Sequence, residues 1–134
     1  EGLLAEQSAI VNAKLLKASD CGASGISCLN GANVNAELAT CDDNASYGVR
    51  SWYDGNVNLN GGTARRGGLS GIYAFSGSKI QAKGSDCRKI DGVDTGGGNA
   101  DVKCLEGSFI TAHSAIGGIN KTTNTLNTDG VIFQ

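Results

Sequence analysis

The first eighteen residues place their large apolar side chains at the spacing of an α-helix. At about 100° per residue, these side chains fall within an arc of roughly 140°. They are Leu3, Leu4, Ile10, Val11 and Leu15. Glu6 precedes Lys14 and Lys17, an order that suits the helix dipole, and Gly22 is available for a left-handed cap. The pattern predicts an amphipathic helix from residue 2 to about 18, with its apolar side packed on the rest of the chain.

Residues 21–46 are small, polar and rich in Gly and Asn, which predicts a long loop. From Tyr47 onward, short alternating segments are separated by Gly, Asn and Asp turn dipeptides, which is typical of strands. The predicted strands are Tyr47–Tyr53, Asn56–Leu59, Gly71–Phe75, Lys79–Ala82, Val102–Leu105, Ser108–Ala112 and Val131–Phe133.

The order of elements, a helix, a loop and then a run of strands, favours a single α+β domain over residues 1–134. In such a domain the helix packs on one face of an antiparallel β-meander. We recognise no internal repeat at a fixed period, which argues against a β-solenoid or a propeller.

Five cysteines and one histidine among 134 residues, with no Cys-x-x-Cys pair, fit a zinc cluster poorly. Disulfides that staple the loops are the better interpretation, and they indicate an oxidising compartment. Five cysteines allow two bridges and one remaining thiol. The chain has no Met, so we expect a mature or truncated product. The net charge of −2 gives no general attraction to nucleic acid, despite the small basic spots at Arg65-Arg66 and Arg88-Lys89.

Two parts of the chain resemble type IV pilins. Glu1-Gly2-Leu3-Leu4-Ala5 followed by Ala13-Lys14 is similar to the exposed half of the long first helix of a pilin. Cys87 and Cys104 are similar to the cysteine pair that closes the C-terminal loop of a pilin. The resemblance implies a disulfide between Cys87 and Cys104 and one further pair among Cys21, Cys28 and Cys41.

If the resemblance holds, the protein is a structural subunit of a type IV pilus-like surface filament that serves adhesion, motility or surface attachment. It would assemble with identical or related subunits and reach the bacterial surface through the inner membrane, anchored by an apolar helix upstream of Glu1. The same resemblance leaves open a major pilin, a minor pilin or a pseudopilin.

An exported carbohydrate-binding or adhesin module is the alternative function. Its candidate surface is Trp52-Tyr53, where two adjacent rings could form a platform for a sugar, although sheet packing also explains them. An enzyme is not expected, because His113 is the single histidine and the adjacent Ser114 lacks the strand–turn–helix geometry of a hydrolase nucleophile. No cofactor is predicted.

One string is compatible with a structural calcium site. Asp54, Asn56 and Asn58 carry oxygen atoms at alternate positions, as calcium loops do. The string lacks a distal bidentate Glu. It fits equally well a half-exposed strand with Val57 and Leu59 directed inward.

Overall fold

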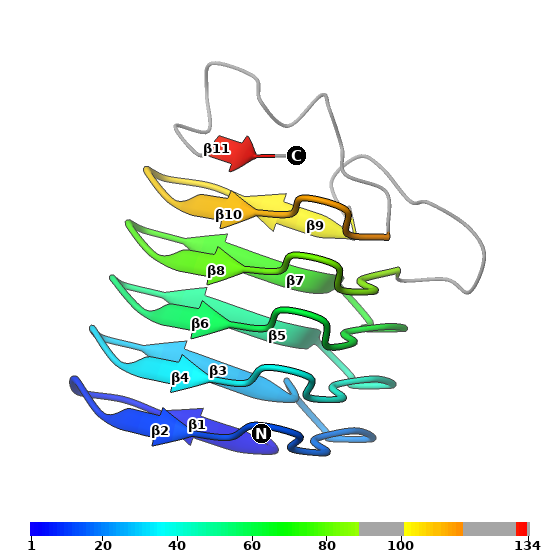
Figure 1. Cartoon of the computed structure of the whole chain (residues 1–134). Helices are drawn as coiled ribbons and strands as arrows, with labels where there is room; N and C mark the ends of the chain where they lie inside the picture. Colours follow the sequence, from blue (N-terminus) through cyan, green and yellow to red (C-terminus); the bar gives the residue numbers. More distant parts are fainter. Residues whose placement is uncertain (89–100, 117–130, 134) are drawn as a thin grey trace.

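The fold is a stack of short β-strands, and the part of the chain that the structure describes contains no helix. A computed structural model describes residues 1–88, 101–116 and 131–133 (Figure 1). A five-stranded sheet contains β1 (Leu3–Ala5), β3 (Ile26–Leu29), β5 (Tyr47–Trp52), β7 (Ser70–Phe75) and β9 (Val102–Cys104). A six-stranded sheet contains β2 (Ile10–Asn12), β4 (Asn33–Asn35), β6 (Asn56–Asn58), β8 (Lys79–Gln81), β10 (Phe109–Thr111) and β11 (Val131–Phe133).

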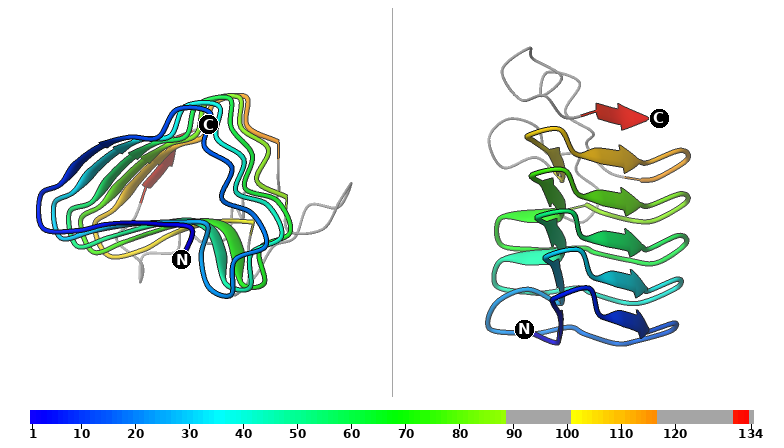
Figure 2. Two further views of the ribbon diagram at one scale, coloured as in Figure 1. Left: turned by 90° about the horizontal axis from the view of Figure 1, so that it is seen from below. Right: turned by 90° about the vertical axis from the view of Figure 1, so that its left-hand side faces the viewer.

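The chain winds as a β-solenoid, in which each of the first five coils adds one strand to each sheet and β11 extends the six-stranded sheet. Every strand pair is parallel. Over the first four coils, paired residues on neighbouring coils lie 23 positions apart, as for Asp42 and Arg65. Between β7 and β9 and between β8 and β10 the interval is 30 residues, as for Ile72 and Val102. Single parallel bridges between Lys17, Thr40, Thr63, Asp86 and Ile116 make a third line of contacts. Figure 2 shows the coils superimposed when they are viewed along the stack.

This architecture corrects the predicted α+β fold. The segment predicted as helix 2–18 forms β1 and β2, and the predicted loop 21–46 contains β3 and β4. Each of the seven predicted strand segments overlaps an observed strand, but the pairing is parallel and not antiparallel. The predicted region 47–134 also includes residues 89–100 and 117–130, which lie outside the described residues.

The apolar residues assigned to helix packing therefore have different positions. Leu3 and Val11 pack against the core from their strands. Leu4 is 49% exposed, Ile10 is 87% exposed, and Leu15 lies in a turn with φ of 60°. Their helical spacing is a coincidence of two strand segments and a turn, because alternate residues of a strand point to opposite faces.

The interior is filled by rows of identical or similar side chains, one from each coil. Ile26, Val49, Ile72 and Val102 form one buried row beneath the five-stranded sheet. Beneath the six-stranded sheet, the row is Val34, Val57, Ile80 and Ile110. A single coil cannot bury its own apolar side chains. Neighbouring coils cover them when they stack, so the coils stabilise one another.

The corner between the two sheets is a tight turn with two consecutive residues in the left-handed region. Asn30 and Gly31 have φ of 52° and 75°, and Ser76 and Gly77 have φ of 52° and 75°. Asn and Gly tolerate this conformation better than β-branched residues. The corner therefore sends the chain from one sheet to the other at the same place in each coil.

Candidate functional site: an amide trough on the six-stranded sheet

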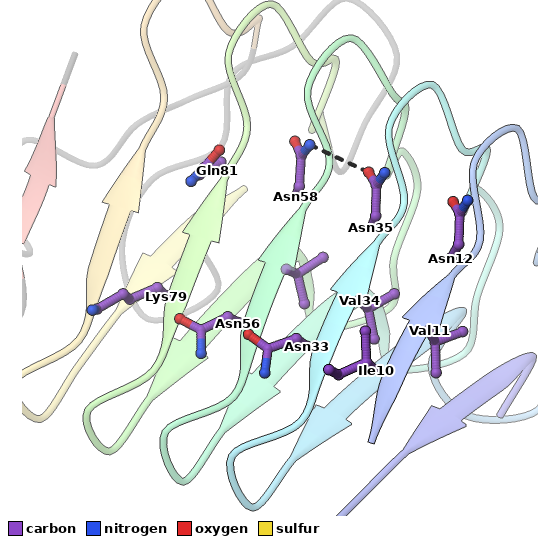
Figure 3. Close-up of a pocket in the computed structure, with 11 residues that line it drawn as sticks. Ile10, Val11, Asn12, Asn33, Val34, Asn35, Asn56, Asn58, Lys79 and Gln81 are labelled. Carbon is purple, nitrogen blue, oxygen red and sulfur yellow. Dashed lines mark hydrogen bonds between the residues drawn. The ribbon is translucent and has the colours of Figure 1, made fainter. Parts of the chain in front are cut away.

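Two rows of mainly polar side chains run along the outer face of the six-stranded sheet (Figure 3). The first outer row is Ile10, Asn33, Asn56, Lys79 and Phe109, and the second outer row is Asn12, Asn35, Asn58, Gln81 and Thr111. Residues of the two rows alternate with the inward-facing Val and Ile residues of the core. Neighbouring members of a row are therefore one rung apart, about 4.8 Å.

The space between the two rows is a depression of about 460 Å³. Its lining combines both rows from Ile10 to Gln81 with the backbone around Val11, Val34 and Val57. We call this depression the amide trough. Val34 and Val57 are buried, so strand backbone, and not side chain, lies between the two rows. Since β4 and β6 are paired on both sides, their backbone hydrogen-bonding groups are already used.

The second outer row presents amide donors to the trough. The side-chain oxygens of Asn12, Asn35 and Asn58 accept hydrogen bonds from the backbone N–H groups two residues later, at 3.4, 3.3 and 3.1 Å. These bonds fix which end of each amide is the oxygen. Their NH₂ groups are the remaining donors of this row. The one on Asn58 donates along the row to the Asn35 oxygen at 3.3 Å.

The first outer row has the opposite polarity. The NH₂ groups of Asn33 and Asn56 donate to the carbonyl oxygens of Gly31 and Asp54, each at 3.1 Å. Among the described residues, no group donates to the side-chain oxygens of Asn33 or Asn56. The amide trough therefore has acceptors along one side and donors along the other, and a group that both donates and accepts can bridge them.

The predicted sugar platform at Trp52-Tyr53 belongs to a different surface, on the five-stranded sheet. Trp52 packs edge-on against Tyr73, with ring centroids 6.0 Å apart, and also contacts Tyr53 and Phe75. The Arg50 guanidinium lies 4.7 Å from the Trp52 ring centroid. These rings mainly cover one another, although Tyr53 is 50% exposed, so the cluster offers less free ring face than the sequence suggested.

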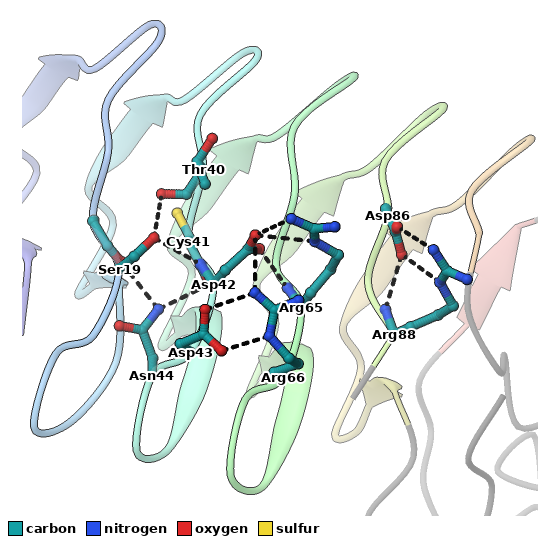
Figure 4. A network of polar contacts seen from close by, with 11 residues as sticks. Ser19, Thr40, Cys41, Asp42, Asp43, Asn44, Arg65, Arg66, Asp86 and Arg88 are labelled. Atoms are coloured by element: carbon teal, nitrogen blue, oxygen red, sulfur yellow. Dashed lines mark hydrogen bonds and ion pairs between the residues drawn. The ribbon is translucent and has the colours of Figure 1, made fainter. Parts of the chain in front are cut away.

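Ion pairs between coils stabilise the corner of the solenoid that follows the line of single bridges through Thr40 and Thr63, which we call the third corner (Figure 4). Asp42 is buried, and its carboxylate accepts from the backbone N–H of Arg65 at 2.8 Å and from the guanidinium Nη2 at 2.6 Å. Arg66 donates to Asp43 of the preceding coil, and this contact lowers the pKa of Asp43. The corner is a structural ladder, because its charges are paired with one another.

No disulfide joins the five cysteines, all of which lie in the described ranges. The predicted partners belong to different rows: Cys87 follows the bridge at Asp86 in the third corner, whereas Cys104 lies in β9. Cys41 and Cys87 share a row but are two rungs apart, about 9.6 Å, which exceeds the roughly 7 Å that a disulfide can span. Parallel stacking therefore separates Cys87 from Cys104 and from Cys41. Cys21 lies close enough to Cys41 to affect its pKa, and a pair among Cys21, Cys28 and Cys41 stays a prediction.

The remaining predicted site residues are distributed as follows. Asn56 and Asn58 stand in different outer rows, Asp54 lies in the preceding turn, and Val57 and Leu59 are buried. The string is therefore the half-exposed strand of the second interpretation, and calcium binding stays a prediction. His113 is exposed. The described residues contain no cluster of His, Cys, Asp or Glu side chains suited to a metal.

No known protein family, characterised protein or solved structure matches the chain. The resemblance to type IV pilins thus has no family match beside it, and the described residues form strands where a pilin has its first helix. The described part of the chain also contains no helix with the length and apolar character of a membrane span. The amide trough is the feature that sequence reasoning missed. The signal was the recurrence of Val-Asn-Ala at Val11–Ala13 and Val34–Ala36, 23 residues apart.

Proposed function

We propose that this chain is a binding module that holds a hydroxyl-rich chain, such as a glycan, in the amide trough. The observation that carries the proposal is the opposite polarity of the two outer rows. A sugar hydroxyl donates one hydrogen bond and accepts others, so it can accept from Asn35 while it donates to Asn33 or Asn56. Each amide of the trough uses one end in a hydrogen bond to the backbone, and the hydrogen-bonding capacity that remains favours such a ligand over an apolar one.

The regular spacing supports an extended ligand. Asn33 and Asn56 lie one rung apart, and the trough continues over several coils. Consecutive units of a linear glycan can therefore meet equivalent amides on consecutive coils. This role corresponds to an exported carbohydrate-binding or adhesin module that acts outside the cell. It involves binding without a catalytic step.

The aromatic cluster is the weaker candidate for sugar binding. Stacking requires a free ring face, and Arg50 covers one face of Trp52, while Tyr73 is only 8% exposed. Assembly into a pilus-like filament stays a prediction. It depended on a helix at residues 2–18, and those residues are in β1 and β2.

The test is to measure binding of a panel of linear oligosaccharides to the wild-type protein and to the double variant Asn33→Ala/Asn56→Ala. The variant removes two acceptors, each with a net value of about 0.5–1.5 kcal/mol, so the Kd should rise roughly fivefold or more. The bonds that these amides make to backbone are exposed, and we expect the fold to be retained by circular dichroism.

Asn60→Ala is the matched control. Asn60 is also an asparagine of the same coil, but its side chain lies outside the trough and accepts from the backbone of Lys83 at 2.9 Å. The control should bind like the wild type. If the wild-type protein binds no oligosaccharide, or if Asn60→Ala weakens binding as much as the double variant does, the proposal is wrong.

A further inference from the structure

The first outer row changes its chemistry along the solenoid. Asn33 and Asn56 are followed on the next coil by Lys79 and then by Phe109, each the Cα partner of the residue before it. Figure 3 shows Lys79 in line with Asn56 and Asn33. One end of the amide trough therefore differs from the neutral amides of its centre.

Lys79 is the only charged side chain among the described residues that line the amide trough. It is exposed, and no described acid pairs with it. Other ion pairs of this region are closed on themselves, as Lys14 and Glu37 are at 2.8 Å. An ammonium group has three hydrogen-bond donors, and here it stands in the row whose other polar members, Asn33 and Asn56, offer acceptors.

Phe109 occupies the next rung of the same row and is 42% exposed. An exposed ring one rung from an ammonium group, about 4.8 Å along the stack, offers an apolar surface beside a positive charge. A sugar ring that carries an anionic substituent has both complementary features, since its C–H face can lie on the aromatic ring while its charge meets Lys79.

We propose that the amide trough selects a glycan with an anionic sugar unit, whose carboxylate or sulfate group contacts Lys79 while its ring lies against Phe109. Neutral units of the same chain then lie along Asn56 and Asn33. This inference rests on the proposed glycan-binding function. The protein has a net charge of −2, so an overall field does not explain a preference for anionic ligands. Such a preference has to be local.

The experiment compares three oligosaccharides of one backbone and length: a uronic-acid form, its carboxyl-reduced neutral form and a sulfated form. Kd values are measured for the wild-type protein, Lys79→Gln and the control Lys83→Gln. Lys83 belongs to the same coil but does not line the trough. We expect the wild-type protein and Lys83→Gln to prefer the anionic forms by roughly three- to tenfold, the range of a partly exposed charge contact.

Lys79→Gln should lose this preference, so that its Kd values for the anionic and neutral forms become similar. The preference should also shrink as salt is raised, because exposed charge contacts are screened. The uronic-acid and sulfated forms show which anionic group is favoured. Phe109→Leu should weaken binding of the anionic forms more than binding of the neutral form.

Equal binding of charged and neutral forms by the wild-type protein would overturn this inference and leave the proposed function intact. So would a preference that survives in Lys79→Gln. If none of the three oligosaccharides binds, both proposals fail. An acidic peptide of similar length is included, and tighter binding of that peptide than of any glycan would also overturn the inference.

Discussion

Replacing Gly71 with alanine should destabilise the protein, whereas the same change at Gly22 should not. A Cβ atom at Gly71 would lie 2.6 Å from the carbonyl oxygen of Ala64 and closer still to that of Cys87. Both obstacles are backbone atoms of the solenoid, which cannot rotate away as a flexible side chain can. A Cβ atom at Gly22 would meet nothing within 4 Å.

The magnitude follows from the two environments. At Gly22, which is not among the glycines with positive φ, alanine reduces the entropy of the unfolded chain and should stabilise by about 0.4–1 kcal/mol. At Gly71 the same entropic gain is opposed by overpacking, which typically costs about 1–3 kcal/mol and sometimes more. We expect the free energies of unfolding of the two variants to differ by about 2 kcal/mol.

Urea unfolding followed by circular dichroism measures this difference through the midpoint and slope for each variant. Similar midpoints for Gly71→Ala and Gly22→Ala would show that no backbone atoms crowd Gly71, which contradicts the stacking of the coils. The helix that the sequence suggested for residues 2–18 makes a different prediction. Gly22 would then be a left-handed cap, and alanine there would destabilise the protein.

Two further predictions concern charge and thiols. Hydrogen bonds from Arg66 and Arg88 lower the pKa values of Asp43 and Asp86, so the stability they contribute is present above the unfolded pKa of about 3.9 and is lost as the pH falls through the lower folded pKa. The urea concentration at the unfolding midpoint should therefore decrease when the pH is lowered beneath about 4, and this decrease should be less steep in Asp43→Asn/Asp86→Asn. An equally steep decrease in that variant would contradict this prediction. Burial raises the pKa of Cys41 to about 12 and also raises that of Cys87, so alkylation of the native protein at neutral pH should leave both unlabelled until denaturant is added, and rapid native labelling read by mass spectrometry would be the contrary result.

The strands from Tyr47 onward could be located from the sequence because alternation and turn dipeptides are local signals. The direction of pairing could not, since Asn56–Asn58 looks the same in a hairpin and in a solenoid. At the N-terminus, Ile10 and Leu15 completed a helical stripe although both are exposed. A comparison of Val11–Ala13 with Val34–Ala36 would have revealed the period of 23 residues and removed the helix.

The amide trough was beyond local reasoning for a related reason. Its rows are formed by residues from successive coils, so Asn33, Asn56 and Lys79 become neighbours only once the register is known. The alternation from Asp54 to Asn58 did indicate polar oxygen atoms on one side of a segment. The structure turns that alternation into two rows of opposite hydrogen-bonding polarity, which no single segment displays.

The most direct test of the central claim is an NMR titration of the labelled protein with the best-binding oligosaccharide, read at the side-chain NH₂ groups of asparagine and at the indole N–H of Trp52. If a glycan lies in the amide trough, the signals of Asn12, Asn35 and Asn58 should shift together until binding saturates, while the Trp52 signal stays in place. Shifts that are confined to Trp52 and its aromatic neighbours, with the asparagine signals unchanged, would contradict the account and assign binding to the five-stranded sheet.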